Sequence, residues 1–132
     1  MERVMVDTSA VYALLDRSDK RHAQAKKLLH HLRVTSAPIL LTNFVVAECH
    51  ALIAGRLGPD LGRAWLRGLV WPVERVTEED ENRAREIILT YEDKSFSYTD
   101  ATTFALMERL NIGTVFAFDI HFAQFGFRLL RD

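Results

Sequence analysis

The sequence has few of the residues and patterns that mark several classes of protein. It contains one cysteine, Cys49, so no disulfide can form within the chain and no cysteine pair suggests a zinc site. No apolar run approaches the roughly 18 residues that a membrane-spanning helix needs. Glu2 and Arg3 precede only a short apolar stretch, which is not typical of a signal peptide. We therefore expect a protein of the reducing cytoplasm.

The sequence also lacks a large net charge of either sign. Seventeen Lys and Arg residues stand against 18 Asp and Glu residues, which gives a formal net charge of -1 at pH 7. The chain therefore has no global basic field of the kind that attracts nucleic acid, although a local basic patch would be enough. The 132 residues are 48% apolar and 27% charged, which predicts one globular domain over residues 1–132.

Short apolar runs alternate with helical patterns along the chain, which is typical of a parallel sheet covered by helices. Strands are expected over residues 3–6, 39–41, 73–76, 115–118 and 127–130. Helices are expected over residues 8–15, 20–33, from 42 or 43 to between 55 and 58, 59–69, 77–91 and 97–110. Right-handed crossovers would place the C-terminal ends of all the strands on one side of the sheet.

Four acidic residues follow apolar stretches or lie close to them. Asp7 and Asp119 each end a predicted strand, whereas Glu48 and Asp100 lie in the first turns of predicted helices. A carboxylate at the edge of an apolar layer loses hydration and repels other carboxylates, so such a group is tolerable mainly around a divalent cation. If the first and fourth strands are neighbours, all four acids can face one crevice at the carboxyl ends of the strands.

The side chains in this group predict a particular chemistry. Oxygen ligands suit hard cations, so Mg²⁺ or Mn²⁺ is the expected occupant. Such a cation activates water and neutralises charge on a phosphate, which indicates metal-assisted phosphodiester hydrolysis. Asp119 or Glu48 could then orient the attacking water. Supporting hydrogen bonds to the carboxylates or to bound water are expected from Thr8, Ser9, Asn43 and Thr99.

Each of these residues also has a purely structural interpretation. Asp7 can cap the helix that follows it, Asp100 can complete a capping box with Ser97, and Asp119 can cap a turn. Glu48 can be a solvated helix residue, and Asn43 and the hydroxyl groups can be caps. The histidines do not have metal-ligand spacing, and His121 is expected to pack or to stabilise a turn. The four acids together favour a shared site.

Basic residues near these elements are candidate contacts for a phosphate backbone. Lys94 precedes Asp100 closely, and Arg17 and Lys20 lie near the start of the second helix. Arg21, Lys26 and Lys27 could contribute from that helix, although a solvated helix face is the favoured explanation for them. The aromatic residues Tyr12, Phe44, Trp65 and Trp71 are expected in the core or in an interface, rather than as platforms for unpaired bases.

Four segments resemble the acidic motifs of the PIN-domain family, and in particular the small toxin nucleases of the VapC type. They are Val6–Ala10, Val45–Glu48, Phe96–Ala101 and Ala117–Phe122, and they occur in the family's order across nearly the whole chain. The resemblance implies a three-layer α/β/α sandwich around a five-stranded parallel sheet with the order 3-2-1-4-5.

The same resemblance implies a function. It identifies Asp7, Glu48, Asp100 and Asp119 as an acidic site, with Asp7 and Asp100 as direct metal ligands. The activity would be Mg²⁺- or Mn²⁺-dependent cleavage of RNA by a homodimer that a small antitoxin protein inhibits.

Other functions were weighed against this one. A receiver-like signalling domain needs a phosphoacceptor after strand three, where Val76 and Thr77 stand, and a lysine that is missing after strand four. A phosphatase with an aspartate nucleophile needs a second aspartate where Ser9 stands. A non-catalytic PIN-fold module that binds a partner, and a PIN nuclease of RNA processing without an antitoxin, both stay open.

Overall fold

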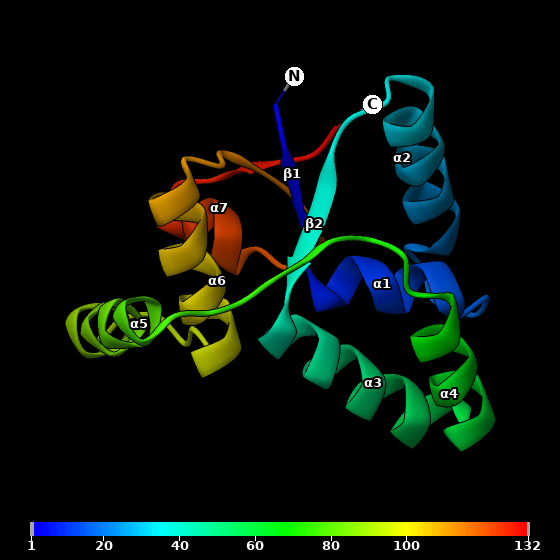
Figure 1. Cartoon of the computed structure of the whole chain (residues 1–132), viewed down its shortest axis with the longest axis horizontal. Helices are drawn as coiled ribbons and strands as arrows, with labels where there is room; N and C mark the ends of the chain where they lie inside the picture. The colour runs from blue at the N-terminus through cyan, green and yellow to red at the C-terminus, as the bar shows by residue number, and fades with distance from the viewer. Residues whose placement is uncertain (1, 132) are drawn as a thin grey trace.

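A computed structural model describes residues 2–131, so residues 1 and 132 of the predicted domain lie outside it. Five parallel strands form one sheet with the order β3-β2-β1-β4-β5. In Figure 1, α1 to α4 lie to the right of the strands and α5 to α7 lie to the left. The predicted α/β/α sandwich and its strand order are confirmed.

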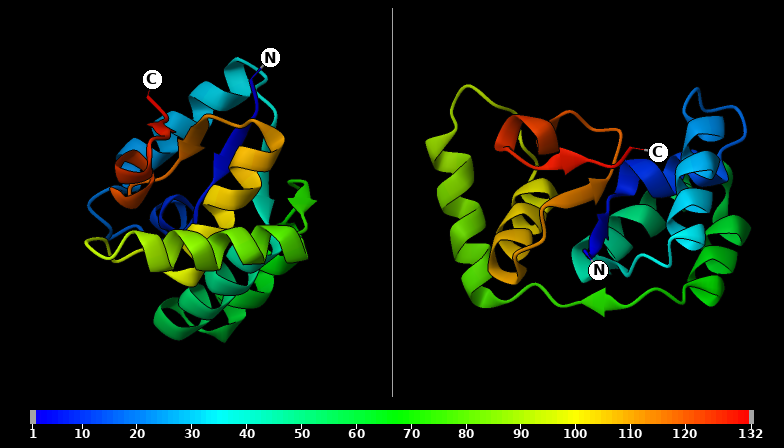
Figure 2. Two further views of the ribbon diagram at one scale, coloured as in Figure 1. Left: turned by 90° about the vertical axis from the view of Figure 1, so that its left-hand side faces the viewer. Right: turned by 90° about the horizontal axis from the view of Figure 1, so that it is seen from above.

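The elements follow the predicted order. The strands are β1 (Val4–Val6), β2 (Ile39–Thr42), β3 (Val73–Glu74), β4 (Thr114–Phe116) and β5 (Arg128–Leu129). The helices are α1 (Thr8–Leu15), α2 (His22–Val34), α3 (Asn43–Leu57), α4 (Pro59–Gly68), α5 (Glu78–Thr90), α6 (Tyr98–Leu110) and α7 (His121–Phe125). Figure 2 shows how the segment from α4 through β3 to α5 connects the two layers of helices along one side of the molecule.

Besides shifts of one or two residues at other ends, such as α2 beginning at His22 rather than at residue 20 and β5 covering only Arg128–Leu129, the structure differs from the sequence prediction in three features that have a clear physical reason. Strand β3 ends at Glu74 rather than at residue 76, because the Val76 N–H donates to Asn43 Oδ1 at 2.8 Å. Strand β4 ends at Phe116 rather than at residue 118, because the Phe118 N–H donates to the Ser9 hydroxyl at 3.0 Å. The short helix α7 was not predicted at all.

Strand β1 separates two hydrophobic cores. Val4 and Val6 pack into the core beneath α1, α2 and α3, while Met5 faces the core built on α5, α6 and α7. Burial on both faces is typical of a central strand in a parallel sheet. Since β4 pairs directly with β1, with Val6 opposite Phe116, the segments that follow these two strands leave the sheet side by side.

Among residues 2–131, no helix is both long enough and apolar enough to cross a membrane.

Candidate active site

Asp7 follows β1 directly and begins α1. Its carboxylate accepts hydrogen bonds from the Ser9 N–H at 3.2 Å and from the Ser9 hydroxyl at 2.7 Å, so Asp7 is the N-cap of this helix, as its structural interpretation predicted. The residue is only 3% exposed. The Ser9 hydroxyl also accepts the Phe118 N–H, which ties Asp7 to the segment after β4. The cap therefore fixes the Asp7 carboxylate at the end of two neighbouring strands.

Asp100 occupies the first turn of α6 and is 6% exposed. It accepts from the Ser97 N–H at 3.1 Å, while its own N–H donates to the Ser97 hydroxyl at 2.9 Å. The predicted capping box is therefore present. In this capping box one carboxylate oxygen of Asp100 accepts the Ser97 backbone N–H, which holds the side chain in one orientation.

Asp119 and His121 complete a close group with Asp100. His121 Nδ1 lies 2.8 Å from Asp100 Oδ2 and 3.2 Å from Asp119 Oδ1, and Asp119 Oδ1 also accepts the His121 backbone N–H at 2.9 Å. One potential ligand atom from each of these three residues lies within 4.8 Å of the others. His121 was expected to pack or to stabilise a turn, and its ring does contact the Phe96 ring. Its imidazole also contacts the carboxylates of Asp100 and Asp119.

The electrostatics of Asp7 show that three of the acids interact. Burial raises the pKa of Asp7 most, the two hydrogen bonds from Ser9 lower it, and the charges of Asp100 and Asp119 raise it further, to about 6. Among the described residues, no Lys or Arg forms an ion pair with Asp7, Asp100 or Asp119, whereas the His121 imidazole contacts the last two. The ionised carboxylates therefore repel one another without a Lys or Arg side chain to offset them.

Glu48 lies on α3 and is half-buried. Neither Glu48 nor Asp7 belongs to the group within 4.8 Å, and the charges of both act on the Cys49 thiol. The pKa of the Cys49 thiol is raised to about 12, mainly by burial and further by the charges of Asp7 and Glu48, while a hydrogen bond with the Thr8 hydroxyl lowers it. Cys49 is therefore an unreactive buried thiol.

The predicted supporting residues divide into two kinds. Ser9 hydrogen-bonds Asp7 directly, and Thr8 is buried beside it. Apart from an interaction with the Cys49 thiol, the Thr8 hydroxyl has no hydrogen-bond partner in the part of the chain that the structure describes.

The other two predicted supporting residues make different contacts. Thr99 accepts hydrogen bonds at its carbonyl oxygen from two hydroxyl groups of α6. Asn43 ties down the end of β3, and Thr42 rather than Asn43 caps α3, so neither role expected for Asn43 is observed.

No ion pair or hydrogen bond of the described residues joins the predicted phosphate contacts to the acids. The Lys94 ammonium pairs with the Asp93 carboxylate at 2.7 Å. Lys20 is exposed in the turn before α2. Arg17 stands at the rim of a cleft.

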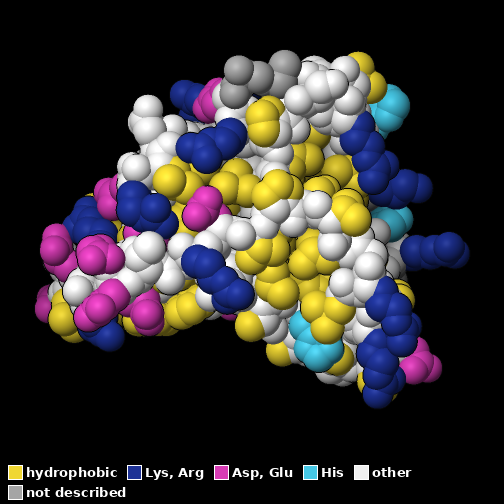
Figure 3. All heavy atoms as spheres, in the orientation of Figure 1, with side chains coloured by type: hydrophobic (Ala, Val, Ile, Leu, Met, Phe, Trp, Pro, Cys, Tyr) yellow, Lys and Arg dark blue, Asp and Glu magenta, His cyan; other side chains and the backbone are white. Residues whose placement is uncertain are grey.

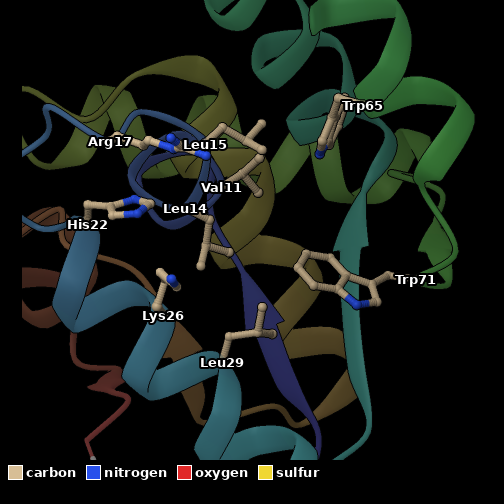
Figure 4. A pocket seen from close by; sticks show the side chains of 9 residues that line it. All are labelled: Val11, Leu14, Leu15, Arg17, His22, Lys26, Leu29, Trp65 and Trp71. Carbon is tan, nitrogen blue, oxygen red and sulfur yellow. The ribbon is translucent and has the colours of Figure 1, made fainter.

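This apolar cleft, of about 460 Å³, lies between α1, α2, α4 and the segment after α4. Its apolar lining consists of Val11, Leu14, Leu15, Leu29, Trp65 and Trp71. Figure 4 shows these side chains facing a shared space, with Arg17, His22 and Lys26 on one side of it. In Figure 3, apolar side chains form a continuous area that basic residues border on the right. The expectation that Trp65 and Trp71 serve a core or an interface agrees with this placement.

The acidic group fits a hard divalent cation. Two carboxylates and an imidazole converge, a third carboxylate is electrostatically coupled to them, and a buried hydroxyl beside it lacks an ordinary partner. Oxygen-rich sites of this kind suit Mg²⁺ or Mn²⁺.

Comparison with known proteins agrees with the fold and identifies the family. Residues 4–128 match the family model described as PIN domain. The chain belongs to the PIN-domain family. It is 34% identical over 128 residues to the protein named 23S rRNA-specific endonuclease VapC20 of Mycobacterium tuberculosis, which covers 94% of this chain and 95% of that one. It is 27% identical over 119 residues to Ribonuclease VapC26 of the same species, covering 88% and 86% of the two chains.

Solved structures give the same result. The crystal structure of VapC20 from Mycobacterium tuberculosis, described as a sarcin-ricin loop cleaving toxin, matches with a TM-score of 0.87 and 32% identity over 98% of this chain and 99% of that chain. DNA-bound VapBC from Salmonella typhimurium matches with a TM-score of 0.70 and 13% identity over 98% of both chains. A toxin-antitoxin complex from Klebsiella pneumoniae gives 0.67 and 12%, over 97% and 96%. The last two show the fold alone, whereas the likeness to VapC20 confirms the resemblance to VapC-type proteins.

Proposed function

We propose that this PIN-domain protein is a metal-dependent endoribonuclease that hydrolyses RNA phosphodiester bonds, and that it is the toxin of a toxin-antitoxin pair. The observation that carries the proposal is the group of Asp100, Asp119 and His121, to which the Asp7 carboxylate is coupled by charge, with no Lys or Arg of the described residues paired to these acids. The similarity to proteins named as ribonucleases supports the choice of RNA as the substrate.

Asp100, Asp119 and Asp7 would hold the cation, with His121 as a neighbour or further ligand. When bound, Mg²⁺ or Mn²⁺ would polarise the scissile phosphate and make a bound water more acidic. The need for a cation follows from the charges: three interacting carboxylates at the carboxyl ends of β1 and β4 disfavour their shared ionised state.

The protein's own residues would position and deprotonate the attacking water. The caps on α1 and α6 hold Asp7 and Asp100 rigidly, so these carboxylates need little reorganisation during the reaction. The Asp119 side chain is 31% exposed and Glu48 is half-buried, so water can reach both. Either Asp119 or Glu48 would accept the proton.

Structured ribosomal RNA is the first substrate to test, because VapC20 is named for cleaving 23S rRNA and described as cleaving the sarcin-ricin loop. Lys94, Arg17 and Lys20 stay candidate contacts for the RNA backbone. An RNA substrate also favours the cytoplasm as the location of the protein.

The apolar cleft is the surface that we assign to the antitoxin. Its apolar floor and its basic rim, formed by Arg17, His22 and Lys26, complement an amphipathic segment that carries acidic residues.

We further propose a homodimer. Val70, which precedes the edge strand β3, and Val73, which begins it, are 85% and 42% exposed and are a candidate part of its interface. Light scattering on the purified protein would measure the oligomeric state.

The decisive experiment incubates the purified protein with Mn²⁺ and an RNA hairpin that carries the sarcin-ricin loop. The parent protein and an Asp7→Asn variant are compared, and an Asp80→Asn variant controls for removal of a buried carboxylate elsewhere. Cleavage by the parent and by Asp80→Asn, but not by Asp7→Asn, is expected. Equal cleavage by all three would contradict the assignment of catalysis to the acidic group, whereas no cleavage by the parent on any RNA offered would favour a partner-binding module.

A further inference from the structure

A second hollow, larger than the apolar cleft, lies between α2 and the edge strand β5. This hollow, which we name the β5 groove, has a volume of about 820 Å³. Its main lining residues are Arg21, Leu28, Phe118, Phe127, Leu130 and Arg131. The C-terminal segment lies beside α2 in Figure 1 and in both views of Figure 2. The groove belongs neither to the acidic group nor to the cleft assigned to the antitoxin.

One end of the β5 groove lies beside the segment that carries Asp119. Phe118 lines the groove and is followed directly by Asp119. The Phe118 N–H donates to the Ser9 hydroxyl, which in turn donates to the Asp7 carboxylate. Ala123 of α7, two residues after His121, lines the groove as well. A ligand that lies in the groove can therefore continue into the acidic site.

The charge of the β5 groove is opposite to that of the site. Arg21, Arg128 and Arg131 line it, and none of its lining residues is acidic. The Arg21 guanidinium lies 5.6 Å from the centre of the Phe118 ring. Arg128 forms an exposed ion pair with Glu2, a contact worth little that a phosphate can replace. The groove thus offers three guanidinium groups above an apolar and partly aromatic floor.

We propose that the β5 groove binds a single-stranded segment of the RNA on one side of the scissile bond, an assignment that rests on the proposed nuclease function. Carboxylates at the site repel phosphates, and the whole chain carries no net positive charge, so attraction must come from a local basic surface. Arginines bind phosphates, while apolar and aromatic side chains pack against unpaired bases. An acidic peptide would satisfy the arginines but would leave the aromatic floor without planar partners.

The test measures binding of a fluorescent single-stranded RNA by anisotropy in EDTA, where no metal-dependent cleavage occurs. An Arg21→Gln/Arg131→Gln double variant is compared with Arg33→Gln/Arg67→Gln, which removes the same charge from exposed positions on α2 and α4 outside the groove. The groove variant should bind at least 10-fold more weakly. The slope of log K against log salt should fall by about 1.4, since each phosphate contact to a single strand contributes about 0.7. Both changes should be absent in the control.

Three results would overturn the proposal. They are equal loss of RNA binding in the two variants, unchanged binding in the groove variant, and binding of a poly-glutamate peptide as tight as that of an RNA of equal charge. Cleavage is read separately with Mn²⁺, and the groove variant should lose more of its rate on a long single-stranded RNA than on a dinucleotide, which is too short to fill the groove. A parent that binds RNA through the groove but cleaves nothing would refute the nuclease function and leave the binding surface standing.

Discussion

Two buried aspartates in this molecule both take part in a helix cap, but one lies beside a guanidinium group and the other is coupled to further carboxylates. Asp7 caps α1, and Asp80 completes a capping box with Thr77 at the start of α5. Burial alone would raise the pKa of Asp80, but the Arg109 guanidinium, which binds both carboxylate oxygens at 2.9 Å, and the Thr77 hydrogen bonds hold that pKa below its ordinary value. The pKa of Asp7 is instead raised to about 6.

The difference shows what distinguishes a functional carboxylate from a structural one. Helix capping explains the position of both residues and therefore identifies neither as functional. The neighbouring charge distinguishes them, because Asp80 has the Arg109 guanidinium, whereas the charges that act on Asp7 are those of Asp100 and Asp119. The cluster of buried carboxylates that has no Lys or Arg partner is therefore the one that needs a bound cation.

The largest effect is expected on catalysis. Asp100→Asn keeps the size of the side chain and an acceptor for Ser97, but removes charge from the acidic group, so RNA cleavage should fall by roughly 100-fold or more. Asp80→Asn should stay within about 3-fold of the parent, because Asp80 is occupied by Arg109. Initial rates with Mn²⁺ measure both. Equal losses would mean that the two regions do not differ in function.

The next effect concerns stability without metal. The folded-state pKa of Asp7, about 6, lies above its ordinary value of 3.8, so the folded protein holds this proton more tightly than the unfolded chain does. The free energy of unfolding should therefore fall as the pH rises from about 4 to about 6, by roughly 3 kcal/mol, and stay low above that. Asp7→Asn removes this cost. In EDTA at pH 7.5 it should be more stable than the parent by up to about 3 kcal/mol, with no difference near pH 4, as measured by urea denaturation.

Asp80→Asn should have a smaller effect of the opposite sign. It loses the charge-assisted hydrogen bonds to Arg109, so the free energy of unfolding at pH 7 should fall by about 2 kcal/mol. Because the folded pKa of Asp80 lies below 3.8, this deficit should persist at pH 5 and shrink only as the pH falls through that value. A gain of stability in this variant, measured by the same denaturation series, would contradict the contrast with Asp7.

Much of the site was predictable because its signals are local or follow from the resemblance. Asp7 follows an apolar run, and Ser97 stands three residues before Asp100, so both caps could be predicted from neighbouring residues. The sheet order came from the likeness to PIN domains. What the sequence could not supply was distance in space: the structure brings Asp100, Asp119 and His121 together and couples Asp7 to the two acids by charge, while Glu48 is not part of this group.

The missed features depend on contacts between distant segments. Helix α7 has only five residues, too few to show a helical period, and it begins where Asp119 accepts the His121 N–H. The one available signal was an acid after a strand with a histidine two positions later. Asn43 bonds to Val76, which is 33 residues away, so no local pattern could reveal its role. The β5 groove likewise joins Arg21 to residues near the end of the chain.

The central claim, that the acidic group lacks a cation which only a bound metal supplies, is tested most directly by the melting temperature in a titration with Mn²⁺ at pH 7.5. The parent and Asp80→Asn should each gain several degrees at saturation, since a ligand at 100 times its Kd stabilises the native state by about 2.7 kcal/mol. Asp100→Asn should gain little. A parent melting temperature that does not move at millimolar Mn²⁺, or an equal gain in Asp100→Asn, would contradict the claim.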